Sequence, residues 1–462
     1  MSRLSHYLAQ NQFCVLLEYL TSTQEILPVP QQLAGFPVCM TLADRVHSDT
    51  DLSPLDAANL YTKDIEKVLH FAGKGRDISD FENFLTAAKN SGQHNLLLLT
   101  GDKLKHHNFG EGQQPRTRYL ESVNAVMAAK KQGGFLIGVA FNPFKYAEAE
   151  QDAQYFKLRK KLTAGADFII TQLGYDIAAL QQVKSFLTEQ HDAQKILACV
   201  MPLTLARAHF MVKHQVAGIV ITTHMLKVLQ EEKTLGLTEP VYQRCALQIL
   251  LCQHLGFAGV HLSACHQAEE QLRLQRYIET YRALDFDACL SLWNDLWQVQ
   301  TGKEFHPELR SYSSPISSAQ ILKYQHLSFI HDAFFESKMA KGVGRFIFKS
   351  RFWDQTPMAH ALLKTEWVSK HAIVGCESCG QCRLGETLYI CPETCPKGLA
   401  NGPCGGTTLD RCEFGDRECI HSVKARLAKA VKQTEILKTE LIPTVPLHIR
   451  DSSSWKNWFR DI

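Results

Sequence analysis

The residues best suited to chemistry in this sequence are eight cysteines gathered in one short stretch near its C-terminal end. They are Cys376, Cys379, Cys382, Cys391, Cys395, Cys404, Cys412 and Cys419. Three cysteines spaced by two residues and followed by a Cys-Pro pair are typical of iron–sulfur ligation. Four thiolates also bind zinc in a tetrahedral site. Eight cysteines are enough for two such sites, and ligand type alone leaves iron–sulfur and zinc both open.

The other seven cysteines are scattered among apolar residues before residue 300, which is typical of buried core thiols. The N-terminal residues lack the apolar stretch of a signal peptide, so we expect a cytoplasmic protein whose clustered cysteines bind metal and form no disulfides. The formal net charge is only +3. A chain so balanced has no broad field to hold nucleic acid or a membrane surface, and we expect neither as a partner.

Short apolar runs alternate with amphipathic helical patterns over the first 265 residues, which predicts parallel strands joined by helices. The eight runs are 13–19, 38–42, 67–71, 95–99, 135–141, 167–172, 195–201 and 259–262. Eight such units favour an α/β fold of the (β/α)8 or TIM-barrel type. A ninth apolar run at 218–222 leaves an open doubly wound sheet as the alternative. No Gly-x-Gly-x-x-Gly follows the first run, which disfavours a dinucleotide-binding sheet.

Composition divides the chain into four segments. Residues 1–290 form the predicted barrel, and residues 291–370 a helical connector that we expect to pack against it. Within the connector, the spacing predicts a helix over 321–341 that Gly342 and Gly344 terminate. Residues 371–425 form a small cysteine-rich metal-binding domain. Residues 426–462 complete the chain as a helix, with apolar positions on one face from 423 to 437, and an extended tail.

Polar residues stand at or near the ends of the predicted strands, where a barrel enzyme has its active site. They include Glu18, Thr41, His70, Asp102, Gln172 and His261. Together they suit a ligand with many hydrogen-bonding ring edges, and they offer a proton donor. Each also has a structural explanation: Asp102 as a helix cap, His70 as a core histidine, Gln172 as a partner of backbone.

One of these strands, Ala164-Gly165-Ala166-Asp167-Phe168-Ile169-Ile170-Thr171-Gln172, resembles a strand of the methylenetetrahydrofolate reductases. Thr100-Gly101-Asp102 resembles the Gly-Asp strand end of that family, and order and spacing agree over roughly residues 10–285. The resemblance implies a barrel that binds FAD and a folate. It also implies hydride transfer between the flavin and the one-carbon unit that 5,10-methylenetetrahydrofolate and 5-methyltetrahydrofolate share. FMN stays open as the flavin, because Thr100 and Phe141 differ from the usual arginine and tyrosine.

By the same resemblance, Glu18 and Asp102 are the expected catalytic residues, with Glu18 as the general acid that opens the five-membered ring of the folate. Glu18, Asp102 and Gln172 are expected to contact the folate. The expected flavin-binding residues are Thr41, His70, Thr100, Gly101, Asp102, Phe141, Lys161 and Ala166. The expected electron donor is NAD(P)H or a reduced iron–sulfur carrier. The family implies a homo-oligomer.

Residues 391–406, including Asn401-Gly402-Pro403-Cys404-Gly405-Gly406, resemble the cysteine-rich C-terminal domain that accompanies such barrels. In that family a similar domain is thought to feed electrons, so our hypothesis is that one or more 4Fe–4S clusters exchange electrons with the flavin, with an electron-transfer protein as a partner. Zinc as a structural staple with no redox role stays open. Two alternatives remain: the same chemistry run oxidatively in demethylation, or a folate- or corrinoid-linked methyltransferase. A zinc module that binds nucleic acid is disfavoured, because the basic residues of this region are few and dispersed.

Overall fold

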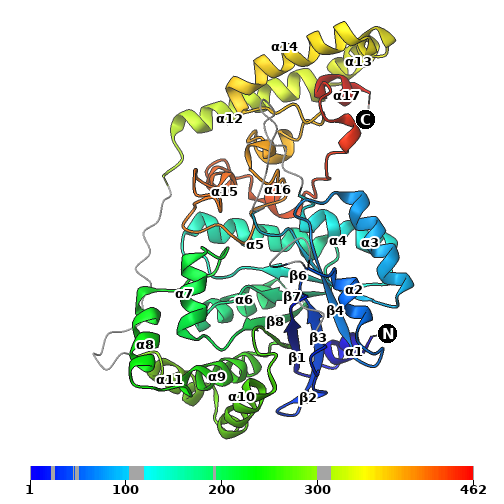
Figure 1. Cartoon of the computed structure of the whole chain (residues 1–462). Coiled ribbons are helices and arrows are strands. Elements are labelled where there is room, and N and C mark those ends of the chain that lie inside the picture. The colour runs from blue at the N-terminus through cyan, green and yellow to red at the C-terminus, as the bar shows by residue number, and fades with distance from the viewer. Residues whose placement is uncertain are drawn as a thin grey trace.

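The computed structural model describes residues 2–21, 26–44, 46, 51–103, 119–190, 194–298 and 314–460. Eight parallel strands close into a barrel, because the first strand pairs with both the second and the last (Figure 1). They are β1 (Cys14–Tyr19), β3 (Phe36–Leu42), β4 (Lys67–Ala72), β5 (Asn95–Leu99), β6 (Leu136–Phe141), β7 (Phe168–Thr171), β8 (Lys195–Val200) and β9 (Gly259–Leu262). A short β2 (Gln32–Leu33) pairs antiparallel with β3. The (β/α)8 prediction is confirmed.

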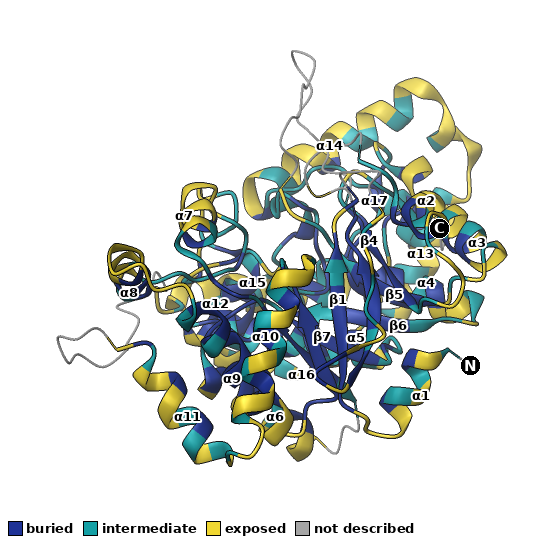
Figure 2. Ribbon diagram, turned by 60° about the horizontal axis from the view of Figure 1, so that its bottom comes forward, coloured by how far each residue is buried: buried dark blue, intermediate teal, exposed yellow. Residues whose placement is uncertain are grey.

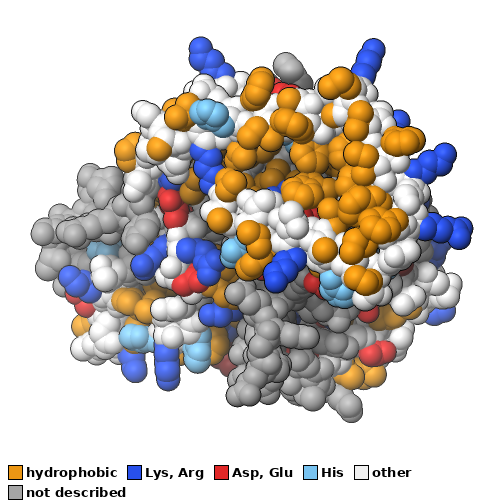
Figure 3. Space-filling model, turned by 90° about the horizontal axis from the view of Figure 1, so that it is seen from above, with side chains coloured by type: hydrophobic (Ala, Val, Ile, Leu, Met, Phe, Trp, Pro, Cys, Tyr) orange, Lys and Arg blue, Asp and Glu red, His pale blue; other side chains and the backbone are white. Residues whose placement is uncertain are grey.

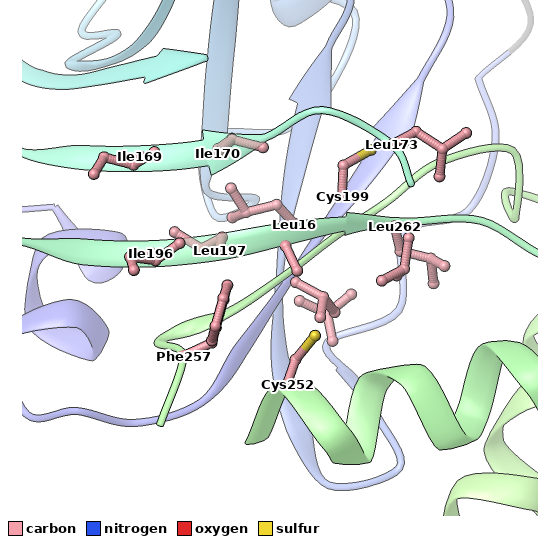
Figure 4. Packing of buried hydrophobic residues seen from close by; sticks show 14 of the residues in the cluster. Leu16, Ile169, Ile170, Leu173, Ile196, Leu197, Cys199, Cys252, Phe257 and Leu262 are labelled. Atoms are coloured by element: carbon pink, nitrogen blue, oxygen red, sulfur yellow. The ribbon is translucent and has the colours of Figure 1, made fainter. Parts of the chain in front are cut away.

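Almost every strand residue is buried, as the dark blue strands of Figure 2 show. Helices cover the outside of the barrel, and apolar side chains fill its inside. Leu16, Ile170, Leu197 and Leu262 pack together in this core (Figure 4). Fully burying one such aliphatic side chain contributes about 2 kcal/mol. The continuous apolar runs of the sequence therefore became strands buried on both faces.

Helices alternate with the strands, and most of them are started by a side-chain cap. They are α1 (Arg3–Ala9), α2 (Pro54–Asn59), α3 (Ile78–Asn90), α4 (Ser122–Gln132), α5 (Glu148–Thr163), α6 (Ile177–Glu189), α7 (Leu205–Lys213), α8 (Thr223–Thr234), α9 (Pro240–His254), α10 (Ala268–Tyr281) and α11 (Phe286–Asp295). The ninth apolar run, 218–222, is not a strand. Its last residue, Thr222, accepts a hydrogen bond from the Met225 amide and caps α8.

Three helices follow the barrel: α12 (Ser318–His331), α13 (Lys338–Phe348) and α14 (Thr356–Val374). The predicted single helix over 321–341 is wrong. A π-helical turn, Asp332–Glu336, ends α12, and Ser337 caps a new helix that contains both Gly342 and Gly344. Gly344 is needed there because an added Cβ would lie 2.4 Å from the Phe459 ring.

The helices α12–α14 lie at the end of the molecule far from α9–α11, beyond the cysteine-rich region (Figure 1). There α12 contacts α15 (Ile420–Ala430), and α13 contacts α17 (Ser454–Phe459). The expected packing of this segment against the barrel is therefore wrong for these three helices. Among the described residues, no helix is both long enough and apolar enough to cross a membrane.

The cysteine-rich region is built of turns and two 3-10 helices, Gly385–Thr387 and Pro392–Thr394. The single helix expected over 423–437 is two helices, α15 and α16 (Thr434–Thr439), separated at Lys432, whose φ is +57°. The expected extended tail is also wrong, because the 3-10 turn Leu447–Ile449 and α17 order it. Both α15 and α16 pack on α5, so the region is docked on the barrel.

Candidate active site at the mouth of the barrel

A cluster of polar side chains surrounds His261 at the mouth of the barrel. The Nε2 atom of His261 lies 3.0 Å from Thr41 Oγ1 and 4.0 Å from Glu18 Oε1. The strand register places Glu18 directly beside Thr41, because β1 and β3 are neighbours. Glu18 keeps a fifth of its side chain exposed, whereas His261 is buried. The carboxyl group of Glu18 therefore lies at the mouth, with the buried ring of His261 behind it.

His70 extends the cluster, with its ring centroid 5.7 Å from that of His261. Its Nε2 atom is buried and has no hydrogen-bond partner in the structure. Burial, and then the neighbouring His261, lower the pKa of His70 to about 3, and burial lowers the pKa of His261 as well. Both imidazoles are therefore neutral near pH 7. An unpartnered ring nitrogen at a barrel mouth is a position for a ligand.

Cys199 and Ser263 complete the cluster on its inner side. Cys199 Sγ lies 3.6 Å from His261 Nδ1 and 3.7 Å from Ser263 Oγ. Burial, and then the Glu18 carboxylate, raise the pKa of Cys199 to about 12, so its thiol stays protonated. Sequence reasoning missed both residues and treated Cys199 as a core thiol. The signal was its place near the end of β8, where strand residues reach the mouth.

The residues expected at the end of β5 face the cysteine-rich region. Lys397 Nζ donates to the Gly101 carbonyl at 2.8 Å and pairs with Glu413 at 2.6 Å. Desolvation raises the pKa of Asp102, and the Lys397 charge partly offsets this effect. The residue nevertheless keeps an exposed surface at the mouth. Thr100 Oγ1 accepts from the Ser122 amide at the start of α4. Lys397 and Glu413 are thus site neighbours that sequence reasoning missed.

Four other expected residues belong to the wall of the barrel and lie outside the His261 cluster. Lys161 is buried, donates to the Ala140 carbonyl, and has its pKa lowered to about 7 by burial. Phe141 packs against another aromatic ring in the core, and Ala166 is buried. The Gln172 side-chain amide donates to the Ala217 carbonyl at 3.1 Å. The structural explanation given above for Gln172 is therefore the one observed.

The cysteine-rich region covers the mouth on the side of β5 and β6. Asn142, which follows β6, donates to the carbonyls of Gly218 and Gly405, both at 2.9 Å. Lys145 donates to the Gly405 carbonyl at 3.0 Å. An added Cβ at Gly218 would lie 2.1 Å from that same oxygen, so only glycine permits this approach. The region is thus part of the site architecture.

The eight clustered cysteines divide into two sets of four. Cys376, Cys379, Cys382 and Cys391 line one small cavity. The second set is Cys395, Cys404, Cys412 and Cys419. Burial raises the pKa of each of these thiols most, and neighbouring thiols of the set raise it further. Four thiols per set is the donor chemistry of a zinc or iron–sulfur site. In the described part of the chain, however, no three potential ligands converge closely enough to hold a metal ion.

Two family profiles match the chain. The profile described as methylenetetrahydrofolate reductase matches residues 34–274, which is more than half of the chain. The profile described as methylene-tetrahydrofolate reductase C terminal matches residues 357–446, which include all eight clustered cysteines. The first match spans β3 to β9, and the second spans α14 to α16.

Curated relatives match over parts of their length. Methylenetetrahydrofolate reductase 2 of Saccharomyces cerevisiae is 28% identical over 165 residues, which cover 35% of this chain and 27% of that protein. Methylenetetrahydrofolate reductase 1 of Schizosaccharomyces pombe is 29% identical over 115 residues, which cover 25% of this chain and 19% of that protein. The match therefore spans less than a third of either relative.

One of the similar solved structures is a Clostridium thermocellum protein described as binding two copies of 5-methyl-5,6,7,8-tetrahydrofolic acid. Its TM-score is 0.41 at 12% identity, over 61% of this chain and 99% of that chain. A dihydropteroate synthetase reaches a TM-score of 0.32 at 11% identity, over 59% of this chain and 95% of that one. These likenesses are too distant to identify a ligand. The long profile match identifies the family: the chain belongs to the methylenetetrahydrofolate reductases.

Proposed function

We propose that this chain is a flavin-dependent enzyme that interconverts 5,10-methylenetetrahydrofolate and 5-methyltetrahydrofolate. The observation that carries the proposal is the Glu18 carboxyl group, held at the mouth of the barrel beside His261 in a member of this family. General acid catalysis needs a proton donor that reaches the reacting atoms from a fixed position. Glu18 combines partial exposure at the mouth with a fixed place on β1, beside Thr41 and near His261.

The residues present fit a flavin ring at the mouth. The unpartnered His70 Nε2 and the Thr41 hydroxyl offer polar atoms to a planar heteroaromatic edge. Thr41, His70, Gly101 and Asp102 are the residues we propose to hold it, whereas Phe141, Lys161 and Ala166 would act from the barrel wall. A bound flavin supplies the hydride chemistry. FAD is our first choice and FMN the alternative.

The protein groups would handle the proton and the orientation of the folate. Glu18 would donate its proton to the folate nitrogen that leaves the one-carbon bridge, which opens the five-membered ring. Neutral His261, bonded to Thr41, would line the side of the mouth on which the Glu18 carboxyl lies. Asp102 would hold the edge of the pterin. The same groups serve the reverse direction, so oxidation of 5-methyltetrahydrofolate in demethylation is the alternative use of this site.

We propose a metal centre in each cysteine set. Cys376, Cys379, Cys382 and Cys391 would hold one, and the second set the other. Burial raises the pKa of Cys376 and Cys404 to about 11, so these thiols stay protonated near neutral pH unless a metal displaces the proton. Iron–sulfur clusters would supply one-electron chemistry there, and zinc would supply a structural staple.

The test is an absorbance spectrum of the anaerobically purified full chain, with iron and zinc analysis, followed by oxidation of 5-methyltetrahydrofolate with an artificial electron acceptor. Flavin bands and turnover that Glu18→Gln abolishes would support the reductase. No flavin after addition of FAD and FMN would overturn it and favour the methyltransferase. Iron with sulfide supports an electron relay, and full turnover after removal of iron contradicts the relay alone.

A further inference from the structure

The helices beyond the cysteine-rich region carry an exposed apolar surface that no described part of the chain covers. Met339 and Phe346 on α13 are 80% and 84% exposed, and Phe329 and Phe334, just before it, are 73% and 65% exposed. Figure 3, seen from above, shows apolar side chains gathered across this end of the molecule. We call this surface, with Val343 and Ile347, the apolar face.

The apolar face is as large as the patches that are often functional on a monomer. If a phenylalanine side chain presents about 200 Å², the three phenylalanines alone expose roughly 400 Å². The largest patch on a typical monomer is about 300–600 Å² in all and is often functional. The face therefore needs an occupant.

The sides of α13 are sharply divided. Met339, Val343, Phe346 and Ile347 recur at helical spacing and share the exposed face. Gly344 lies on another side, tight against Phe459 of α17. A third side is basic, with Lys338, Lys341, Arg345 and Lys349 at helical spacing, and Arg351 follows the helix.

Positive charge is concentrated on this segment. Residues 314–375 contain eight Lys or Arg and four Asp or Glu, a net charge of +4, whereas the whole chain has only +3. From Lys338 to Trp353 there is no acidic residue. The nearest acids already have partners: Glu336 pairs with Lys341, and Asp354 pairs with Lys456 and Arg460. The near-neutral total charge, from which we expected no membrane partner, hides this local excess.

The charge and the shape of the apolar face indicate which kind of partner covers it. A second copy of the chain would present the same net positive segment, so like charges would oppose that pairing. The apolar side chains project from the outer surface of the helix, and the cavity beside it is lined by Lys341, Arg345, Trp458 and Phe459 instead. Projecting aromatic and aliphatic groups flanked by lysine and arginine are typical of helices that lie in the interface of an anionic lipid bilayer.

We propose that α13, with the neighbouring Phe329 and Phe334, docks the protein reversibly on an anionic membrane surface. The phenylalanines and Met339 would enter the boundary between headgroups and acyl chains, and Lys338 and Lys349 would contact the lipid phosphates. The helix lies flat on the bilayer and does not cross it, consistent with its 11 residues. The barrel mouth takes no part in this contact, so the proposal stands apart from the proposed catalytic function.

The test is co-sedimentation of the full chain with vesicles of phosphatidylcholine alone or mixed with phosphatidylglycerol. We expect binding to the mixed vesicles only, weakened by salt and made about tenfold weaker by Phe346→Ser. The matched control is Leu272→Ser, which removes a side chain 65% exposed on α10 and leaves binding unchanged. Lys349→Gln should reduce the preference for phosphatidylglycerol.

Melting curves and 5-methyltetrahydrofolate oxidation by each variant report whether it folds and whether the barrel works. Equal sedimentation with and without phosphatidylglycerol overturns the proposal. Loss of a dimer in light scattering on Phe346→Ser also overturns it, and assigns the apolar face to a second copy. If Phe346→Ser fails to fold, Met339→Ser makes the same test from a neighbouring position.

Discussion

Glu121 is a buried residue through which the barrel holds the cysteine-rich region. Its carboxylate pairs with Lys157 at 2.8 Å and accepts from the backbone amides of Ala400 and Asn401, both at 3.1 Å. Glu121→Gln removes the negative charge and leaves the buried Lys157 ammonium with its hydrogen bond to the Gly402 carbonyl but without a counter-charge. Breaking a buried ion pair from one side costs about 3–5 kcal/mol. We therefore expect this single change to destabilise the docked region strongly.

The same pair predicts a dependence on pH. Burial alone would raise the pKa of Glu121, but Lys157 and the hydrogen bonds from Asn401 and Ala400 outweigh burial and lower it. A carboxyl group with a lowered folded-state pKa contributes stability above its unfolded-state pKa of about 4.3. That contribution is lost as pH falls from there through the folded-state pKa. Wild-type stability should fall below about pH 4.3, and Glu121→Gln should lack that part of the slope.

Urea unfolding of the full chain, followed by tryptophan fluorescence from pH 3 to pH 7, measures both effects. The matched control is Glu148→Gln, because Glu148 lies on α5 and pairs with Lys429 of α15 across the same boundary, but is exposed. Exposed pairs contribute little, so this control should stay close to wild type. Lys157→Met added to Glu121→Gln should recover part of the loss. Equal losses in Glu121→Gln and Glu148→Gln would refute the reasoning.

Three further changes test the site. Glu18→Gln should lower the rate of 5-methyltetrahydrofolate oxidation about 10²–10⁴-fold with an unchanged melting curve, and an unchanged rate would remove Glu18 from the chemistry. Gly218→Ala should lower the free energy of unfolding by about 1–3 kcal/mol, because the new Cβ would clash with Gly405 and because φ at this position is +73°. Gly236 has a φ of +70° but open space around it, so Gly236→Ala in the same melting experiment measures the backbone effect alone. Cys391→Ser should lower the iron or zinc content of the purified protein, and an unchanged metal content would exclude this thiol as a ligand.

The barrel could be predicted because parallel strands that are buried on both faces are continuous apolar runs in the sequence. Each of the eight apolar runs became a strand, and polar residues near the strand ends, such as Glu18 and Thr41, were brought side by side. The run 218–222 was ambiguous because its composition suits a strand. Thr222 settles it, since a side-chain cap starts α8 at that point.

The region after the barrel was harder to predict because its structure depends on distant contacts. Gly342 and Gly344 were expected to end a helix, which is their usual effect. Here Gly344 lies inside α13 because Phe459, 115 residues later, approaches it too closely for any side chain. The local signal was Ser337, whose hydroxyl accepts from the Ala340 amide and starts the helix.

The candidate site was predicted in part for the same reason. Strand position placed Glu18, Thr41, His70 and His261 at one mouth, but it could not show that His261 bonds Thr41 and lies near Glu18. It also could not show that the side chain of Gln172 donates a hydrogen bond to the backbone carbonyl of Ala217. Such choices depend on rotamers and on which neighbour offers a partner, and no spacing in the sequence encodes them.

Lys397 couples the charges of the cysteine-rich region to the end of β5 in the barrel. Lys397 lies two residues after Cys395, bonds the Gly101 carbonyl, and pairs with Glu413. Cys404 in turn donates to Glu413 at 3.2 Å. The charges that surround Asp102 therefore come from the cysteine-rich region as much as from the barrel. Four deprotonated thiols carry more charge than a divalent ion neutralises, so a metal bound by the second cysteine set would leave net negative charge next to this group. Occupancy of that set and the protonation of Asp102 should therefore change together.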